Sequence, residues 1–188
     1  MELADAVEED RRAQASEHAW LLGRFVVPAG TDVDGRALAV VGNGQERQDD
    51  AVYLEGETLD EVAARRVRAK IRCGGEHIPS VEELAEFVRG CRTRRLIFKA
   101  TAGLHHAYPT DEGEHGFLNL LAAAVFGDEE EALREGPGAF ELDETSFRWG
   151  SREALPAKLV GVRSSLFHSI GSCSFFEPVA ELEKLGIL

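Results

Sequence analysis

Residues 58–101, TLDEVAARRVRAKIRCGGEHIPSVEELAEFVRGCRTRRLIFKAT, contain the pattern that decides the fold. The stretches 58–61 (TLDE) and 80–83 (SVEE) have the spacing of a capping box, which predicts the start of a helix at each place. The runs 68–73 and 96–101 follow these helices and predict strands. Strands that alternate with helices predict a parallel sheet with right-handed crossovers.

Further strands are expected on both sides of this stretch. Short runs of β-branched and aliphatic residues at 25–27, 37–41 and 52–54 predict three strands, separated by glycine and aspartate and therefore joined by loops. Residues 169–174 predict a last strand, which makes six candidate strands in the sheet. Residues 1–22 read as an N-terminal helical segment, followed by a single domain over residues 23–188.

The region between the fifth and sixth candidate strands is expected to be mixed. Residues 115–126 predict a helix that is apolar almost all round, and such a helix is buried inside the domain or at a contact between identical subunits. An acidic helix follows, then a small hairpin over 140–149 and a helix over roughly 152–167. A short helix after Pro178 ends the chain.

Length limits the choice among parallel α/β folds. An eight-stranded (β/α) barrel typically needs about 250 residues, and this chain has 188. The sequence therefore predicts an α/β domain of parallel βα units that forms a partial or atypical TIM-like (β/α) barrel. An open α/β sheet is the alternative.

Composition excludes some classes of partner. The chain has 21 Lys and Arg against 34 Asp and Glu, a net charge of −13, which disfavours nucleic acid and anionic membranes as partners. Its longest strongly apolar run, residues 118–127, is too short to cross a bilayer, and no export signal is expected. Three cysteines without a CxxC pair favour a reducing compartment, so we expect a cytoplasmic protein.

Cations interrupt two strands that should be apolar. Lys70 and Arg72 are two residues apart in one predicted strand, and Lys99 has the same spacing to Thr101 in the next. Alternate residues share one face of a strand, so we expect the three cations to converge in one cavity. The alternative is that one strand is an edge, or that the cations pair with a buried acid such as Glu55.

Three of the six histidines lie near the end of the strand that carries Lys99. His105 and His106 lie in the long loop 102–114, and His115 opens the next helix, which suits proton transfer. A metal held with Asp111 or Glu114 is the alternative, but adjacent histidines point in opposite directions in extended chain. Surface or packing roles are expected of the other histidines, His18, His77 and His168.

The segment 171–174, GSCS, ends the last predicted strand just before a helix. Its hydroxyls, Ser172 and Ser174, and the amides at the helix start could bind phosphate or carboxylate, or the segment could be an ordinary helix entry. Cys173 is read as inert packing, because a cysteine in a buried strand is seldom a nucleophile. Glycines at other strand ends fit either plain turns or close approach of the backbone.

Four motifs in order resemble an uncharacterised, barrel-like family of bacterial proteins: KIRCGG at 70–75, IFKATAGLHHAYP at 97–109, EHGFLNLLAAA at 114–124 and SIGSCSFFEP at 169–178. The resemblance implies a fold over residues 24–188 but no activity. Residues 98–103, FKATAG, are also similar to the strand of deoxyribose-phosphate aldolases that carries the Schiff-base lysine, which implies that role for Lys99. The two histidines directly after this stretch depart from the aldolase pattern.

The functional hypothesis is an enzyme that acts on a small anionic metabolite bearing a carbonyl or phosphate group, with lyase or aldolase-like chemistry as the first candidate. The alternative is a non-catalytic protein for anion binding or assembly. No cofactor and no metal site are predicted, and a divalent metal is the remaining alternative. The residues expected to be catalytic are Lys99, His105, His106, His115 and Lys70. Substrate binding is expected of Arg72, Glu55, Thr101, Asn119, Ser172 and Ser174.

Overall fold

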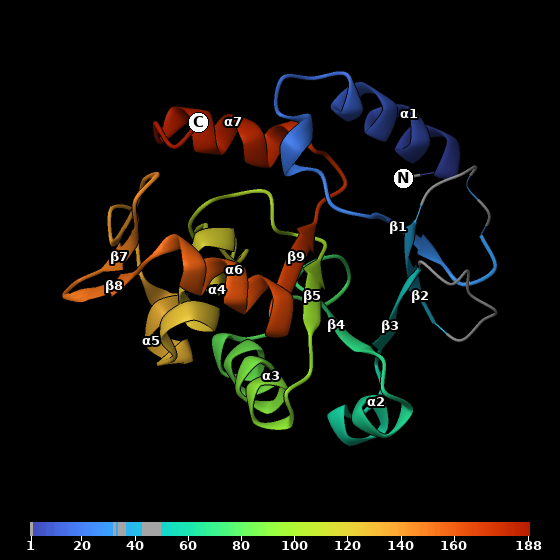
Figure 1. Ribbon diagram of the computed structural model, residues 1–188, viewed down its shortest axis with the longest axis horizontal. Helices are drawn as coiled ribbons and strands as arrows, with labels where there is room; N and C mark the ends of the chain where they lie inside the picture. Colours follow the sequence, from blue (N-terminus) through green and yellow to red (C-terminus); the bar gives the residue numbers. More distant parts are fainter. Residues whose placement is uncertain (1, 32, 34–36, 43–49) are drawn as a thin grey trace.

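A curled, six-stranded parallel sheet forms the centre of the protein (Figure 1). The computed structural model describes residues 2–31, 33, 37–42 and 50–188. The strands lie side by side in the order β1-β2-β3-β4-β5-β9. The sheet that they form curls into half a barrel. The strand bounds are β1 Phe25–Pro28, β2 Leu38–Val41, β3 Ala51–Glu55, β4 Arg68–Arg72, β5 Phe98–Thr101 and β9 Phe167–Gly171. The α/β class and the parallel βα units are therefore confirmed.

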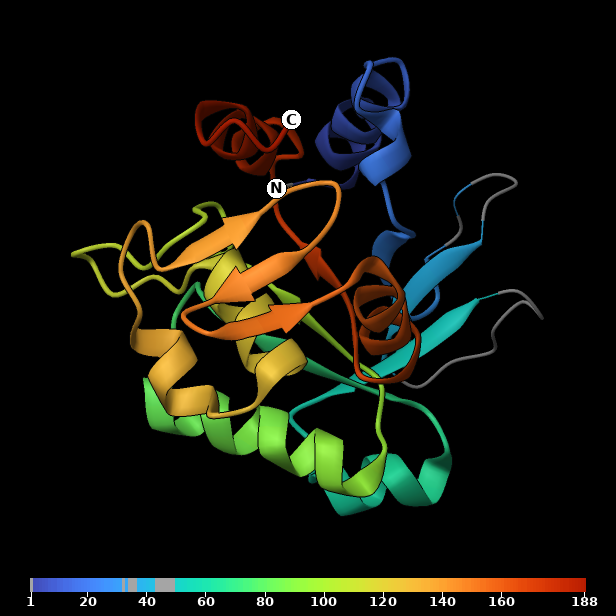
Figure 2. The ribbon, with the colours of Figure 1, turned by 60° about the vertical axis from the view of Figure 1, so that its left-hand side comes forward.

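Both capping boxes are present and start the helices predicted from them. Helix α2 spans Leu59–Arg65 and helix α3 spans Val81–Arg94, with Thr58 and Ser80 as the N-cap residues. The connections from β1 to β2 and from β2 to β3 lie partly outside the described residues, at positions 32, 34–36 and 43–49. Helices α2 and α3 lie together at the bottom of Figures 1 and 2, on the side opposite the N- and C-terminal helices.

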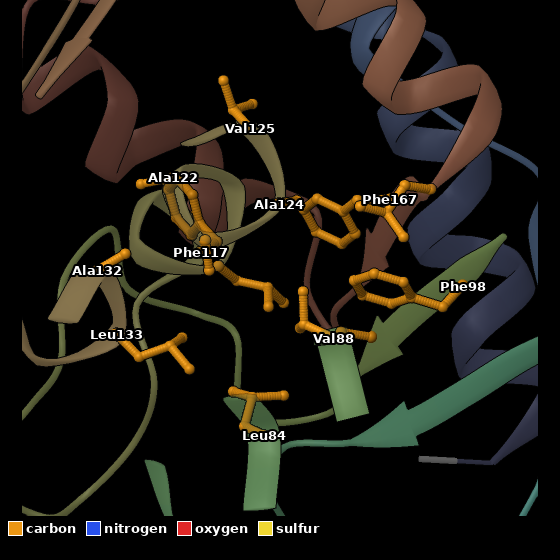
Figure 3. Close-up of a cluster of buried hydrophobic side chains, with 14 of the residues drawn as sticks. Leu84, Val88, Phe98, Phe117, Ala122, Ala124, Val125, Ala132, Leu133 and Phe167 are labelled. Atoms are coloured by element: carbon orange, nitrogen blue, oxygen red, sulfur yellow. The ribbon is translucent and has the colours of Figure 1, made fainter. Parts of the chain in front are cut away.

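The main hydrophobic core lies between the convex face of the sheet and the helices. Leu84 and Val88 of α3 face Phe98 of β5, whose ring stacks on Phe167 of β9 with the centroids 5.1 Å apart (Figure 3). Helix α4, Phe117–Phe126, is buried along most of its length, and helix α5, Glu129–Arg134, packs beside it. The sequence predicted that the helix now seen as α4 would be buried almost all round, and this burial is achieved within one chain.

A second, three-stranded antiparallel sheet confirms the hairpin predicted over 140–149 and adds a third strand that was not predicted. Its strands are β6 Phe140–Leu142, β7 Phe147–Trp149 and β8 Arg152–Ala154, and helix α6 begins only at Pro156 and ends at Ser165. The prediction of a helix from residue 152 was therefore wrong for the first turn of that helix. Arg152 pairs with Trp149 across a two-residue turn and places its guanidinium 4.1 Å from the indole centroid, a hairpin contact that outweighs helix propensity.

Two helical segments cover the carboxyl ends of the strands. Helix α1, Leu3–Gln14, and the short 3-10 helix η1, Ala19–Leu21, lie beside helix α7, Phe176–Lys184 (Figures 1 and 2). The Arg12 guanidinium lies 5.1 Å from the centroid of the Phe176 ring, and His18 Nε2 is 3.0 Å from Glu183 Oε1. Among the described residues, no helix is long and apolar enough to cross a membrane.

The concave face of the sheet changes character along the strands. Val26, Ala39, Ala51 and Tyr53 form an apolar cluster on this face. The curl brings the first and last strands together. A methyl group placed on Gly171 of β9 would lie 3.7 Å from the side chain of Val26 on β1. Nearer the carboxyl ends the same face becomes polar.

Candidate functional site

Five charged and polar side chains share the concave face near the carboxyl ends of the central strands. Glu55 of β3 is in register with Lys70 of β4, Lys70 with Lys99 of β5, and Arg72 with Thr101. Residues in register on parallel strands point to the same side of the sheet. The period-2 alternation thus predicted correctly that the cations of β4 and β5 share one face.

Glu55 pairs with two cations of β4, Lys70 and Arg72. Its Oε2 accepts a hydrogen bond from Lys70 Nζ, and its Oε1 lies 3.7 Å from Arg72 Nε. Burial of Lys70 lowers the pKa of its ammonium, although the hydrogen bond and charge of Glu55 oppose this shift. The pairing that the sequence analysis kept as an alternative is therefore present for Lys70 and Arg72.

Lys99 differs from Lys70 and Arg72 because no carboxylate of the described residues forms an ion pair with it, although Glu9 and Asp10 line the same cavity. Only 2% of the residue is exposed, and its Nζ has no hydrogen bond or ion pair with the residues that the structure describes. Its nearest aromatic partner is Tyr53, whose ring centroid is 5.8 Å away. Burial, and next the positive charge of Lys70, lower the pKa of Lys99 to about 8. About a tenth of this amine is therefore neutral at pH 7, far more than for a lysine with the ordinary pKa.

Tyr53 lies beside this amine and is hydrogen-bonded to His168, and neither residue was singled out as part of a site from the sequence. The Tyr53 hydroxyl is 2.6 Å from His168 Nδ1, and burial raises the pKa of Tyr53. Burial, followed by the charges of Arg68 and Lys99, lowers the pKa of His168. His168 was expected on the surface or in packing, but a register shift between β5 and β9 makes it an extra residue that reaches inward.

Two hollows open at the carboxyl ends, and the three cations are divided between them. A cleft of about 360 Å³ is lined by Lys70 and Arg72, whereas a cavity of about 330 Å³ beneath α1 and α7 is lined by Lys99. The prediction that the three cations converge in one cavity was therefore wrong, because Glu55 holds Lys70 on the β3 side of the sheet. Both hollows share one wall, made by Val26, Gly171, Ser172 and Cys173.

Thr101 contributes an unsatisfied hydroxyl to the cleft. Its Oγ1 is buried and has no hydrogen-bond partner among the described residues, and the residue is 8% exposed. A buried hydroxyl without a partner costs about 1–3 kcal/mol. A bound molecule or an ordered water in the cleft would remove this cost.

Glycines bring the ends of β4 and β5 together. A methyl group on Gly103, whose φ is +64°, would lie 2.4 Å from the carbonyl oxygen of Cys73. One on Gly74 would lie 2.8 Å from Gly103 Cα. Of the two alternatives for these glycines, the structure shows close approach, and the backbone approached is that of the neighbouring strand.

The three histidines near this end of the sheet lie in different surroundings. His105 Nδ1 is 2.5 Å from Glu177 Oε2 and 3.1 Å from Ser172 Oγ, at the wall between the hollows. His106 is half exposed, 3.6 Å from Glu114. His115 is buried, and its Nε2 is 2.7 Å from the Pro79 carbonyl oxygen.

Asn119 and His115 do not line either hollow. The Asn119 side chain is fully buried and donates hydrogen bonds of 2.8 Å to the carbonyl oxygens of Ala132 and Glu135. It thus joins α4 to the end of α5 rather than approaching Lys99. Within the described part of the chain, no three His, Cys, Asp or Glu residues are grouped as metal ligands.

The segment that could bind phosphate already holds a carboxylate of the same chain. Glu9 Oε1, on α1, accepts hydrogen bonds of 3.2 Å from the Ser174 hydroxyl and the Phe175 amide. The Ser172 hydroxyl accepts a bond of 3.2 Å from the Ser174 amide. Glu9 therefore fixes α1 over the cavity that Lys99 lines.

Comparison with known proteins finds no match to a family model, a curated protein or a solved structure. The motif resemblance therefore stays a prediction.

Proposed function

We propose that the protein is an enzyme that forms a Schiff base between Lys99 and the carbonyl carbon of a small anionic metabolite. The observation that carries this proposal is the Lys99 amine, which is 2% exposed, has no anionic partner among the described residues, and has a pKa lowered to about 8. A neutral lysine amine in an enclosed site is the nucleophile that carbonyl chemistry needs.

The reaction begins when the neutral Lys99 amine adds to the carbonyl carbon. The carbonyl oxygen leaves as water with two hydrogens, and an imine remains. Protonation of the imine then makes it an acceptor for the electrons of a neighbouring bond. Tyr53 and His168, hydrogen-bonded at 2.6 Å beside this amine, supply groups that hold or move a proton.

The charge of the site supports an anionic substrate. Lys99 shares its cavity with Arg24 and with the acidic residues Glu9 and Asp10, whereas in the cleft Lys70 and Arg72 carry two positive charges when protonated and Glu55 offsets one of them. The surplus favours a carboxylate or phosphate on the substrate despite the net charge of −13 on the whole chain. A substrate anion would compete with Glu55 for Arg72, whose side chain is 56% exposed.

The same proposal includes a relationship to the TIM-like (β/α) barrels and a cytoplasmic location. The sequential order of six parallel strands, with the polar groups at their carboxyl ends, supports the first. The unpaired state of Cys73, Cys91 and Cys173 supports the second.

A non-catalytic anion-binding or assembly protein is the second candidate. The cleft lined by Lys70, Arg72 and the unpartnered Thr101 hydroxyl favours it, because this cleft does not need Lys99 to hold an anion. The two candidates differ in one respect: only the enzyme forms a covalent bond to Lys99.

Borohydride trapping tests the choice. The protein is incubated with small aldehydes and ketones, with and without a carboxylate or phosphate group, then reduced and mapped by mass spectrometry. We expect label on Lys99, its absence in Lys99→Arg, and the strongest labelling from the anionic compounds. The exposed residues Lys158 and Lys184 report background labelling within the same sample.

Two outcomes contradict the enzyme. A panel that labels Lys158 and Lys184 but never Lys99 removes the Schiff base. Protection of the protein against heat by the anionic compounds, without any label on Lys99, supports the binding protein instead.

A further inference from the structure

Cys173 differs from the other two cysteines of the chain. Cys73 and Cys91 are buried in the core, where burial raises the pKa of each thiol to about 12. Cys173 is exposed and lines both hollows at the carboxyl ends of the strands. The sequence analysis placed it in a buried strand, but β9 ends at Gly171 and leaves Cys173 in the turn before α7.

A histidine and a carboxylate stand in line with this thiol. Cys173 Sγ is 3.7 Å from His105 Nε2, within hydrogen-bond reach for sulfur. The other ring nitrogen of His105, Nδ1, is 2.5 Å from Glu177 Oε2. The three residues come from the turn after β9, the loop after β5 and the first turn of α7.

The order of these contacts defines the direction of proton transfer. An ionised carboxylate only accepts hydrogen bonds, so His105 Nδ1 carries a hydrogen and donates it to Glu177. In the neutral ring, Nε2 then has its lone pair free and faces the thiol of Cys173. The thiol can therefore give its proton to Nε2, while Glu177 stabilises the imidazolium that results.

We propose that Cys173, His105 and Glu177 form a second catalytic centre, in which the thiol attacks activated acyl groups such as esters and thioesters. This centre goes beyond the amine chemistry of Lys99 and does not depend on it. It makes use of His105, which the imine mechanism of Lys99 leaves without a role.

The chemical step balances with water as the only co-reactant. His105 Nε2 takes the thiol proton as Cys173 Sγ bonds to the acyl carbon. The bond from that carbon to the leaving oxygen or sulfur breaks, and the leaving group takes the proton from His105. Water then attacks the thioester on Cys173, with His105 as the base, and releases a carboxylic acid and the free thiol.

The cleft indicates the class of acyl compound. Cys173 lines the same hollow as Lys70 and Arg72, and its volume of about 360 Å³ fits a small molecule. Thr101 adds a buried hydroxyl that lacks a partner among the described residues. A short acyl compound with a negatively charged group at its far end therefore fits best.

Acylation by p-nitrophenyl acetate tests this centre. The full chain is mixed with the ester, and nitrophenol release and the mass of each cysteine peptide are followed. We expect one acetyl group on Cys173, none in Cys173→Ser, and a rate at least about tenfold above that of N-acetylcysteine, because a positioned base typically contributes 10²–10⁴-fold.

Variants separate a catalytic arrangement from simple exposure of the thiol. His105→Gln should lower the acylation rate by about tenfold or more, and Glu177→Gln should lower it by a smaller factor, because the ring stays in place but loses its anion. The matched control is His77→Gln, which changes another histidine that lies 3.8 Å from a glutamate on the surface, and it should leave the rate unchanged.

Either of two results overturns the centre. One is a wild-type rate at Cys173 no higher than that of N-acetylcysteine, a comparison that needs no variant to fold. The other is an unchanged rate in His105→Gln. Failure of borohydride to trap Lys99 would contradict only the Schiff base, because acetylation is read on the peptide that contains Cys173.

Discussion

Replacing Lys99 with methionine should stabilise the protein at neutral pH. Lys99 is 2% exposed without a carboxylate partner among the described residues, and its pKa lies at about 8 instead of the ordinary 10.5. A shift of about 2.5 pKa units corresponds to about 3 kcal/mol at 1.36 kcal/mol per unit. Methionine has a similar length and no charge to bury, so the free energy of unfolding should rise by about 3 kcal/mol at pH 7.

The stability gained by Lys99→Met should depend on pH, and the pKa of Lys99 fixes the direction of this dependence. Between pH 8 and 10.5 the folded protein holds Lys99 neutral while the unfolded chain still binds a proton there. Wild-type stability therefore rises with pH through this window relative to Lys99→Met, and most of the advantage of methionine disappears by pH 10.5.

Urea denaturation of both proteins at pH 7 and pH 10.5 measures this difference. Lys184→Met, a change at an exposed lysine, serves as the control and should alter stability little at either pH. A Lys99→Met protein that is less stable than wild type at pH 7 would refute the reasoning. A difference between the two proteins that does not change with pH would refute it as well.

Other predictions concern the cover over the site, the core and metal. Glu9→Gln should cost about 1 kcal/mol of local stability and speed amide hydrogen exchange in α1 about fivefold, because it weakens two hydrogen bonds to the start of α7. Asn119→Ala should lower the free energy of unfolding in urea by about 3 kcal/mol, since it leaves two carbonyl oxygens without their donor. A chelator should leave the melting temperature unchanged, whereas a large drop together with a stoichiometric metal would make His105, His106 and His115 candidate ligands.

Much of the sheet is predictable because its signals are local. The pairs Thr58 with Glu61 and Ser80 with Glu83 start their helices through contacts within one turn, so no tertiary information is needed. The alternation in β4 and β5 is equally local, and it places Lys70 and Lys99 on one face.

The misread elements depend on which strands pair, and helix or strand periodicity does not show this. Residues 152–154 become a strand because β7, just across the turn at residues 150–151, offers them a partner, with Phe147 opposite Ala154. His168 turns inward through a register shift against β5 that its own neighbours do not encode. Sequence periodicity carries no information on either pairing.

The site is predictable only where strands define it. Glu55, Lys70, Arg72, Lys99 and Thr101 lie on the face expected for them. Cys173 and His105, in contrast, are 68 residues apart and meet through two turns. Loop conformation decides that contact, and the residue types alone do not reveal it.

The central claim is that Lys99 has a reactive amine, and competitive labelling within one sample tests it most directly. At pH 7 about a tenth of Lys99 is neutral, against about 0.03% of a lysine with the ordinary pKa of 10.5. The protein is treated with glycolaldehyde and cyanoborohydride, and the labelling rates of Lys99 and exposed Lys184 are compared by peptide mapping. We predict that Lys99 is labelled at least about tenfold faster. Equal or slower labelling of Lys99 would contradict the claim.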